Sequence, residues 1–245
     1  MVEKPVGIPT PDGVADGFLI QPEKEGRWPG IIHLTDIGGI RRASKEMATR
    51  QAAEGYIVLL PNIFYRTHKP PVFSEPIKFG DEQFVKRVTE LRQALPPEEQ
   101  DRDVGAYVDF LARQPSVKGS RFGVVGYCFT GPMTLRTPAV RPHQVAAAAS
   151  FHSGGLYTDA PISPHLLLPR VKARLYFGHA TEDRSMPKEA IEKFDRALAS
   201  WGGQYGSEVY PSHHGWTVPD NPSYDEPQAE HAFTKLIQLF AETLK

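Results

Sequence analysis

The sequence contains a single cysteine, and this scarcity excludes one class of protein. Cys128 carries the only thiol among 245 residues, so no disulfide can form within the chain. Small secreted folds that depend on disulfides are therefore excluded, and a lone thiol fits the reducing cytoplasm, which we predict as the location. The first residues, MVEKPVGIPTPDG, have no apolar core, and we expect no signal peptide there.

Long apolar runs and an excess of one charge are also missing. No run approaches the roughly 18 apolar residues of a transmembrane helix, so we expect no membrane association. The 28 basic and 29 acidic residues give a net charge of −1, which excludes a strongly basic nucleic-acid binder and an acidic disordered tail. We therefore expect no nucleic-acid partner. No heptad pattern or exposed apolar stripe stands out, so a monomer is the default expectation.

Motifs for nucleotides and metals are absent as well. The chain has neither G-x-G-x-x-G nor G-x-x-x-x-G-K-[ST], so nucleotide binding has no support. Its nine histidines include no H-E-x-x-H or similar close pairing typical of metal ligands. We therefore expect neither a cofactor nor a metal.

The composition does provide for a sizeable core. Hydrophobic residues make up 40% of the chain, and 23 prolines with 21 glycines indicate many fixed loops. Length alone allows one large domain or two small ones. Short apolar runs alternate with helical patterns from about residue 18 to the end, so we expect a single domain over residues 1–245.

Seven apolar segments are predicted as strands: Asp16–Ile20, Pro29–Leu34, Tyr56–Pro61, Arg121–Gly126, Val145–Ser150, Ala173–Gly178 and Ser207–Tyr210. Several are unbroken apolar runs, which are typical of strands buried on both faces of a parallel sheet. Four segments show helical spacing or helix-boundary signals: Ser44–Ala53, Asp103–Gln114, the stretch from an N-cap at Ser185 to Gly202, and Pro227–Leu244. The order predicts an α/β fold with a mostly parallel, doubly wound sheet. Residues Arg66–Gly80 are predicted as a long loop, either functional or simply exposed.

The strongest motif surrounds the cysteine. The apolar strand RFGVVG runs into Gly126-Tyr-Cys128-Phe-Thr130-Gly131, and a helix-compatible segment follows. Strand, sharp turn and helix form a nucleophile elbow, in which small neighbours let the backbones approach closely. Thr130 is larger than the glycine usual at its position. The new helix would direct its amides at the sulfur and lower the pKa of the thiol.

A nucleophile needs a base, and the base needs an orienting acid. Asp183 follows a predicted strand end and is the best candidate acid, with Glu182 as its competitor. After the last predicted strand come His213 and His214, and spacing alone does not choose between them. The nucleophile, the acid and the histidine follow one another in this order, and the chain between them is long enough for the intervening strands and helices.

These residues resemble the dienelactone hydrolases (carboxymethylenebutenolidases) of the α/β-hydrolase superfamily. The resemblance covers nearly the whole chain, and the motifs that carry it are Gly126-Tyr-Cys128, Gly178-His-Ala-Thr-Glu-Asp183, His214-Gly-Trp216 and Thr35-Asp36-Ile37-Gly-Gly39. It implies an α/β-hydrolase fold and a carboxylic ester or lactone as the small-molecule substrate.

Carried over residue by residue, the resemblance implies Cys128 as nucleophile, Asp183 as orienting acid and His214, chosen by its His-Gly-Trp pattern, as base. The backbone amides of Ile37 and Phe129 would form the oxyanion hole.

Two positions depart from the family pattern. Asp36 stands where the prototype has a glutamate beside its thiol. The arginine that follows the base motif and holds the substrate carboxylate is missing, so Arg66 is a candidate to supply that charge. Further candidates for substrate contact are Tyr65, His152 and Trp216, of which Trp216 fits loop packing at least as well.

The resulting hypothesis is acyl transfer to water through a thioester on Cys128. Two alternatives remain open. One is a hydrolase of thioesters or carbon–halogen bonds on the same scaffold, and the other is a non-catalytic or redox-sensing protein with an oxidisable cysteine.

Overall fold

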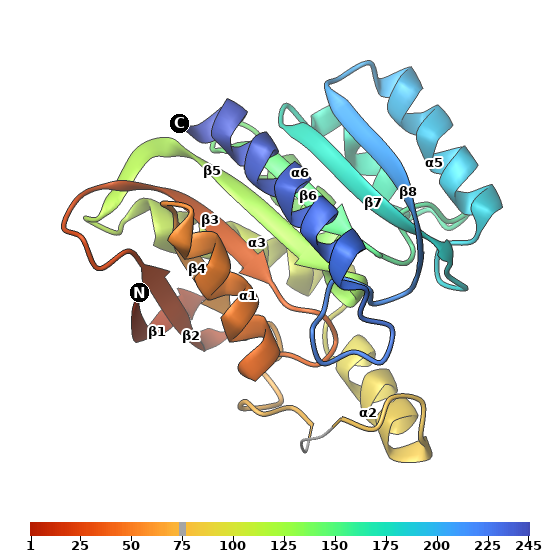
Figure 1. Cartoon of the computed structure of the whole chain (residues 1–245), viewed down its shortest axis with the longest axis horizontal. Coiled ribbons are helices and arrows are strands. Elements are labelled where there is room, and N and C mark those ends of the chain that lie inside the picture. The colour runs from red at the N-terminus through yellow and green to blue at the C-terminus, as the bar shows by residue number, and fades with distance from the viewer. Residues whose placement is uncertain (74–76) are drawn as a thin grey trace.

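The fold is built on one eight-stranded sheet, seen in a computed structural model that describes residues 1–73 and 77–245 (Figure 1). Its strands are β1 (Val2–Thr10), β2 (Gly13–Gln21), β3 (Trp28–Leu34), β4 (Ile57–Pro61), β5 (Val117–Tyr127), β6 (Val145–Phe151), β7 (Arg174–Glu182) and β8 (Tyr205–His213). Their spatial order is β1-β2-β4-β3-β5-β6-β7-β8. Strand β2 is antiparallel to both its neighbours, and all other pairs are parallel. The expected mostly parallel α/β sheet is therefore confirmed.

Helices cover both faces of this sheet. They are α1 (Arg42–Ala53), α2 (Glu82–Gln93), α3 (Pro97–Ala112), α4 (Gly131–Val140), α5 (Lys188–Trp201) and α6 (Glu226–Leu244), with short 3₁₀ turns η1 (Cys128–Thr130) and η2 (Pro164–Arg170). Helices α1 and α6 lie on one face, and α3, α4 and α5 lie on the other (Figure 1). Helix α2 lies beyond the end of the sheet at which β5 ends (Figure 1).

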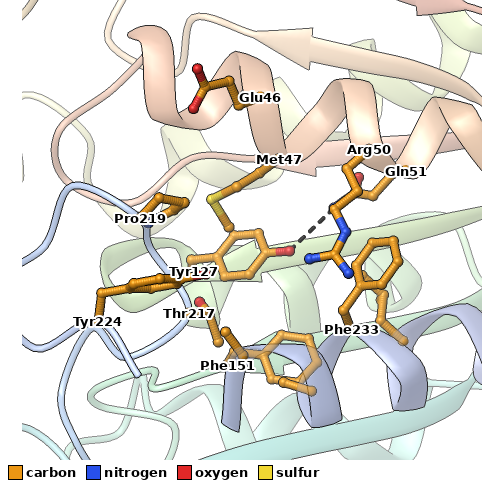
Figure 2. Close-up of a pocket in the computed structure, with 13 residues that line it drawn as sticks. Glu46, Met47, Arg50, Gln51, Tyr127, Phe151, Thr217, Pro219, Tyr224 and Phe233 are labelled. Carbon is orange, nitrogen blue, oxygen red and sulfur yellow. Dashed lines mark hydrogen bonds between the residues drawn. The ribbon is translucent and has the colours of Figure 1, made fainter. Parts of the chain in front are cut away.

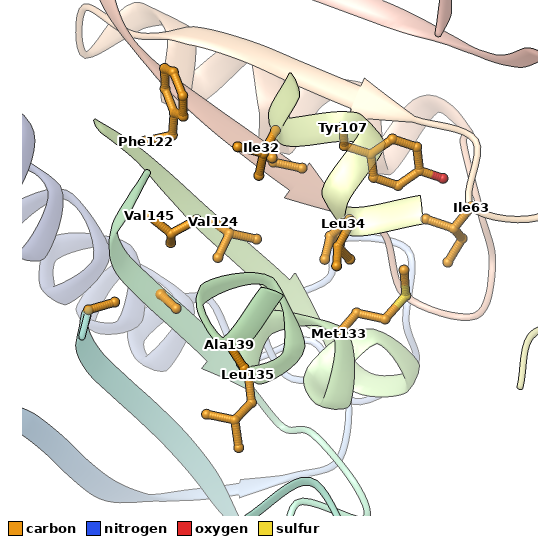
Figure 3. Close-up of a cluster of buried hydrophobic side chains, with 14 of the residues drawn as sticks. Ile32, Leu34, Ile63, Tyr107, Phe122, Val124, Met133, Leu135, Ala139 and Val145 are labelled. Carbon is orange, nitrogen blue, oxygen red and sulfur yellow. The ribbon is translucent and has the colours of Figure 1, made fainter. Parts of the chain in front are cut away.

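Two apolar cores, one on each face, explain the unbroken apolar runs of the central strands. Successive side chains of a strand point to opposite faces. Val124 accordingly packs into the core under α3 and α4, whereas Val125 packs into the core under α1 and α6. Figure 3 shows the first core, where Tyr107 of α3 and Met133 of α4 face the strand side chains Leu34 and Val124.

All seven predicted strands and all four predicted helices are present, with shifted ends. Strand β1 and helix α2 were not predicted. The predicted N-cap at Ser185 is wrong. Helix α5 begins at Lys188, its N-cap residue is Pro187, and no side chain forms a capping hydrogen bond. Within the predicted loop Arg66–Gly80, the described residues form neither helix nor strand, and residues 74–76 lie outside the description.

None of the helices in the described part of the chain is long and apolar enough to cross a membrane.

Candidate active site

The cysteine lies on a sharp turn between β5 and α4. Its φ of 53° is in the left-handed region, which a non-glycine residue adopts only under strain and which is common at functional sites. Close packing around the turn requires small neighbours: a Cβ on Gly126 would lie 2.6 Å from Thr134, and one on Gly131 would lie 2.0 Å from Ser153. The backbone therefore has the strand-turn-helix geometry expected from the motif.

The hydroxyl of Thr130 forms hydrogen bonds with the backbone around the turn. Its Oγ1 atom accepts a hydrogen bond from the Tyr127 amide at 2.9 Å and lies 3.3 Å from the carbonyl oxygen of Leu34. The side chain is fully buried. The residue that departs from the usual glycine thus ties the turn to the neighbouring strand β3.

His214 lies between the cysteine and an aspartate. Its Nε2 atom is 3.0 Å from Sγ of Cys128, and its Nδ1 atom is 2.6 Å from Oδ2 of Asp183. His214 follows β8 directly and Asp183 follows β7, so the parallel strands deliver both side chains to the same end of the sheet as the cysteine.

Ser185, which the sequence suggested only as a helix cap, completes the surroundings of the aspartate. The amide and hydroxyl of Ser185 donate to Oδ1 of Asp183 at 2.8 and 2.5 Å. The competing pair lies outside this arrangement: His213 and Glu182 are both exposed, with Nδ1 and Oε2 3.3 Å apart. Geometry therefore separates the two histidines and the two acids that sequence spacing left open.

The hydrogen bonds of His214 govern its charge. Burial disfavours the imidazolium, but hydrogen bonds to Asp183 and Cys128 and the negative charges of these two groups outweigh burial and raise the pKa of His214 to about 10. Burial likewise acts to raise the pKa of Asp183, but its hydrogen bonds from His214 and Ser185 hold that pKa below the usual value. The arrangement therefore favours the protonated, imidazolium form of His214.

His152, at the end of β6, lies next to His214 with the two ring centroids 5.3 Å apart. It is fully buried, and burial together with the nearby positive charge of His214 keeps its pKa well below the usual value. Its Nε2 atom lies 2.7 Å from the hydroxyl of Thr217. Trp216 is fully buried behind it, with its ring against His152 and stacked on Tyr210, so Trp216 supports the site without lining the pocket.

Asp36 faces the same pocket, but an arginine holds its carboxylate. Arg41 donates to both carboxylate oxygens at 2.6 and 3.0 Å, and the amide of Gly38 donates at 3.0 Å. Arg41 also binds Asp220, which follows His214 along the chain, at 2.7 and 2.8 Å. The described contacts of the Asp36 carboxylate do not include the thiol, and its partner Arg41 joins the loop after β3 to the loop after β8.

The two expected oxyanion-hole residues line the pocket with the cysteine. Ile37 follows β3, and Phe129 follows Cys128 at the start of the turn into α4. The backbone N–H of Ile37 donates to no other residue in the described part of the chain. It is therefore available to a ligand.

The pocket above the cysteine encloses about 230 Å³. Helix α2, which was not predicted, supplies one wall through Phe84, Val88 and Arg92. Arg92 is the one arginine or lysine among the described lining residues, and no described residue pairs with its guanidinium. A signal for α2 was present: Asp81 caps the helix, and Phe84, Val88 and Leu91 follow at helical spacing.

Two expected substrate contacts lie elsewhere. Arg66 binds Asp103, Asp12 and Glu99 through its guanidinium, and the hydroxyl of Tyr65 bonds to Asp103 in the same network. Neither residue lines the pocket. The expectation for Arg66 is corrected for a physical reason: a cation already surrounded by three carboxylates is not free to bind a substrate anion.

Comparisons with known proteins identify the family of the chain. Residues 15–244 match the model of the dienelactone hydrolase family. A Synechocystis sp. protein provisionally named carboxymethylenebutenolidase is 27% identical over 98% of this chain and 96% of its own length. A carboxymethylenebutenolidase of Rhodococcus opacus is 26% identical over 93% of this chain and 86% of its own length.

Solved structures share the fold. A provisionally named dienelactone hydrolase of Klebsiella pneumoniae superposes with a TM-score of 0.85 at 20% identity, covering 98% of both chains. A dienelactone hydrolase-like promiscuous phosphotriesterase from metagenomic libraries gives a TM-score of 0.80 at 20% identity over both full chains. The expected α/β-hydrolase fold is thereby confirmed, and the chain belongs to the dienelactone hydrolase family, whose members are hydrolases acting on ester and lactone bonds.

Proposed function

We propose that the protein hydrolyses a carboxylic ester or lactone through an acyl-thioester on Cys128, with His214 as the base and Asp183 as its orienting acid. The observation that carries this proposal is the position of the His214 ring, which bridges the thiol at 3.0 Å and the buried carboxylate at 2.6 Å. This is the relation between nucleophile, base and acid that nucleophilic catalysis requires.

In the first half-reaction the Cys128 thiolate attacks the substrate carbonyl carbon. The carbonyl oxygen becomes an oxyanion, to which the amides of Ile37 and Phe129 donate. Such preorganised donors contribute roughly 3–4 kcal/mol each to transition-state stabilisation. The C–O bond to the leaving group then breaks, the His214 imidazolium protonates the departing oxygen, and the acyl group remains on sulfur.

In the second half-reaction the neutral imidazole of His214 removes a proton from water. The hydroxide attacks the thioester carbonyl, the tetrahedral intermediate collapses, and the C–S bond breaks. The carboxylic acid leaves, and thiolate and imidazolium are restored as a pair. Asp183 stabilises the imidazolium and keeps Nε2 directed at the sulfur in both halves.

The pocket supports a small substrate with an apolar body and one negatively charged group. Its walls include Phe84, Val88 and Phe129, and the unpaired Arg92 offers the matching cation. Because a thiolate is a better leaving group than an amide nitrogen, the tetrahedral intermediate of a peptide would return to substrate. Esters and lactones with enol-type leaving groups are therefore favoured over amides.

Kinetics of a Cys128→Ala variant test this proposal. We expect hydrolysis of p-nitrophenyl acetate to fall to background, because the remaining groups have no nucleophile to activate. A panel of thioesters and haloacids, assayed alongside, distinguishes a carboxylic ester hydrolase from the two other reaction types. Wild-type rates in Cys128→Ala, or a wild-type protein inactive on every ester while its cysteine oxidises readily, would contradict the proposal.

A further inference from the structure

A second cavity lies on the opposite side of the catalytic residues from the pocket described above. It encloses about 120 Å³ between α1 and α6, beneath the loop that follows β8 (Figure 2). No lining residue is shared between the two cavities. Concave sites with a mostly apolar lining and a few polar groups are where small molecules bind proteins.

The floor of this second cavity is buried and rich in aromatic rings. Tyr127, Phe151, Ala232 and Leu236 are each less than 5% exposed and line it from the sheet and from α6. Figure 2 shows the rings of Tyr127 and Phe151 with the Phe233 ring at one side. An apolar floor of this kind favours a flat ring over a polar or charged group.

The rim is polar and open to solvent. Glu46, Arg50 and Tyr224 are exposed there, and Arg50 pairs with Glu230 while its guanidinium lies over the Phe233 ring. Deeper in the cavity, the Gln51 amide donates to the Tyr127 hydroxyl at 3.2 Å (Figure 2). Charges of both signs at the rim fit a neutral hydrogen-bonding group better than an anion, and the volume limits the apolar part to one ring. A dry cavity of about 150 Å³ is known to accept benzene, which sets the scale.

The wall between the two cavities consists of residues adjacent in the chain. Tyr127 lines the second cavity, and the next residue, Cys128, lines the catalytic pocket. Likewise, Phe151 lines the second cavity and His152 lines the catalytic pocket. Thr217, in the second cavity, holds Nε2 of His152 through its hydroxyl. A molecule in the second cavity would therefore contact the direct neighbours of the nucleophile.

From these contacts we infer that the second cavity is a binding site for a small neutral molecule with one aromatic ring and one hydrogen-bonding substituent. The ring packs on Tyr127 and Phe151, and the substituent points to the rim beside Arg50. The inference does not depend on the proposed ester hydrolysis, and ligand binding alone tests it.

Phenol serves as the probe. Crystals of the wild-type protein soaked in phenol should show the ring in the second cavity. In solution, a titration followed by ¹H–¹⁵N NMR should shift the Gln51 side-chain amide with a millimolar dissociation constant. Density for phenol only beside Cys128, or no binding at any soluble concentration, would overturn the inference.

Two variants that fill the cavity, Ala232→Leu and Ala229→Leu, provide the matched comparison. Both add apolar volume at lining positions of α6, where leucine is a good helix former. Each should weaken phenol binding by at least about tenfold, because most of a single-ring ligand's affinity comes from contacts with the floor. Gln238→Leu, on an exposed position of the same helix, should bind as the wild type does. Unchanged affinity in a folded filling variant would refute the site even if phenol binds elsewhere.

Discussion

His214 illustrates how individual side chains acquire their chemistry from their neighbours. An isolated imidazole is mostly neutral at pH 7, whereas contacts with Cys128 and Asp183 raise the pKa of His214 to about 10. His152, only 5.3 Å away between ring centroids, is held neutral by burial. Two adjacent histidines thus differ in charge because only one of them has anionic partners.

If Asp183 orients His214 as proposed, replacing it should disable the proposed base. An Asp183→Asn variant can no longer stabilise the imidazolium and favours the wrong tautomer, so kcat should fall by about 10³- to 10⁴-fold with little change in KM. Steady-state hydrolysis of a p-nitrophenyl ester measures this. Glu182→Gln, which changes the exposed neighbouring acid, is the control and should keep wild-type kinetics; equal losses in both variants would refute the assignment.

Arg92 should determine the preference for charged substrates. In an Arg92→Ala variant, KM for an ester bearing a carboxylate should rise by about tenfold, because an unpaired guanidinium that lines the pocket is lost. KM for a neutral ester of the same size should stay unchanged. Arg87→Ala, on the same helix but outside the pocket lining, is the matched control. A parallel rise for both esters would indicate a loss of wall structure instead of a loss of charge recognition.

At the level of secondary-structure elements, one buried arginine connects two loops of the site. Arg41 binds Asp36 in the loop after β3 and Asp220 in the loop after β8, with bidentate geometry to each carboxylate. The first loop carries the free amide of Ile37, and the second carries His214. We therefore expect the relative position of the proposed oxyanion donor and the proposed base to depend on this guanidinium.

An Arg41→Met variant should lose both stability and turnover. It leaves the carboxylate of Asp36 buried without its partner, which costs about 3–5 kcal/mol of unfolding free energy. Urea unfolding measures the stability, and the kcat of the folded fraction reports the alignment of the loops. Asp220→Asn keeps Arg41 on Asp36, so it should be destabilised less while kcat still falls. Wild-type kcat in both folded variants would show that the two loops hold their positions without Arg41.

The sequence predicted those elements whose local pattern and tertiary environment agree. The central strands are buried on both faces, so their apolar runs predicted them correctly. The turn at Cys128 was predicted because the strand, turn and helix patterns agree around it. Asp183 was the best candidate acid from chain order, and the His-Gly-Trp pattern favoured His214 over His213. The structure adds that the competitors Glu182 and His213 are both exposed.

In the elements that were not predicted, β1 and α2, the local sequence pattern is weak. Strand β1 is an edge strand that contains Pro5 and Pro9 and is mostly exposed, so it has little apolar alternation. Helix α2 buries only Leu91 and contacts the sheet little, so its pattern is weak. The ion pairs of Arg66 with Asp103 and of Arg41 with Asp220 join residues far apart in sequence, and no local pattern predicts them.

For the molecule as a whole, buried neutral histidines set its behaviour in acid. Burial lowers the pKa of His33 and of His179 to about 4, and neither ring nitrogen of His179 has a partner among the described residues. Below pH 6.5 the unfolded chain takes up protons at these histidines that the folded protein does not, so acid favours unfolding.

Thermal unfolding should therefore show a stability loss as the pH falls from 6.5 towards 4. For His179 the full effect is about 3 kcal/mol, the equivalent of the difference between the two pKa values. A His179→Leu variant should depend less on pH over this range, whereas His143→Gln, at an exposed position, should follow the wild type. A wild-type melting temperature that is constant between pH 6.5 and 4 would contradict this account.

The central claim is that the sulfur of Cys128 carries the acyl group during turnover, and rapid-quench intact-mass spectrometry tests it most directly. After mixing with p-nitrophenyl acetate and quenching in acid within milliseconds, the wild-type protein should gain the mass of one acetyl group. Peptide mapping should locate that group on Cys128, and a His214→Gln variant should accumulate it more slowly. Turnover without any acyl adduct, or an adduct on another residue, would contradict the account.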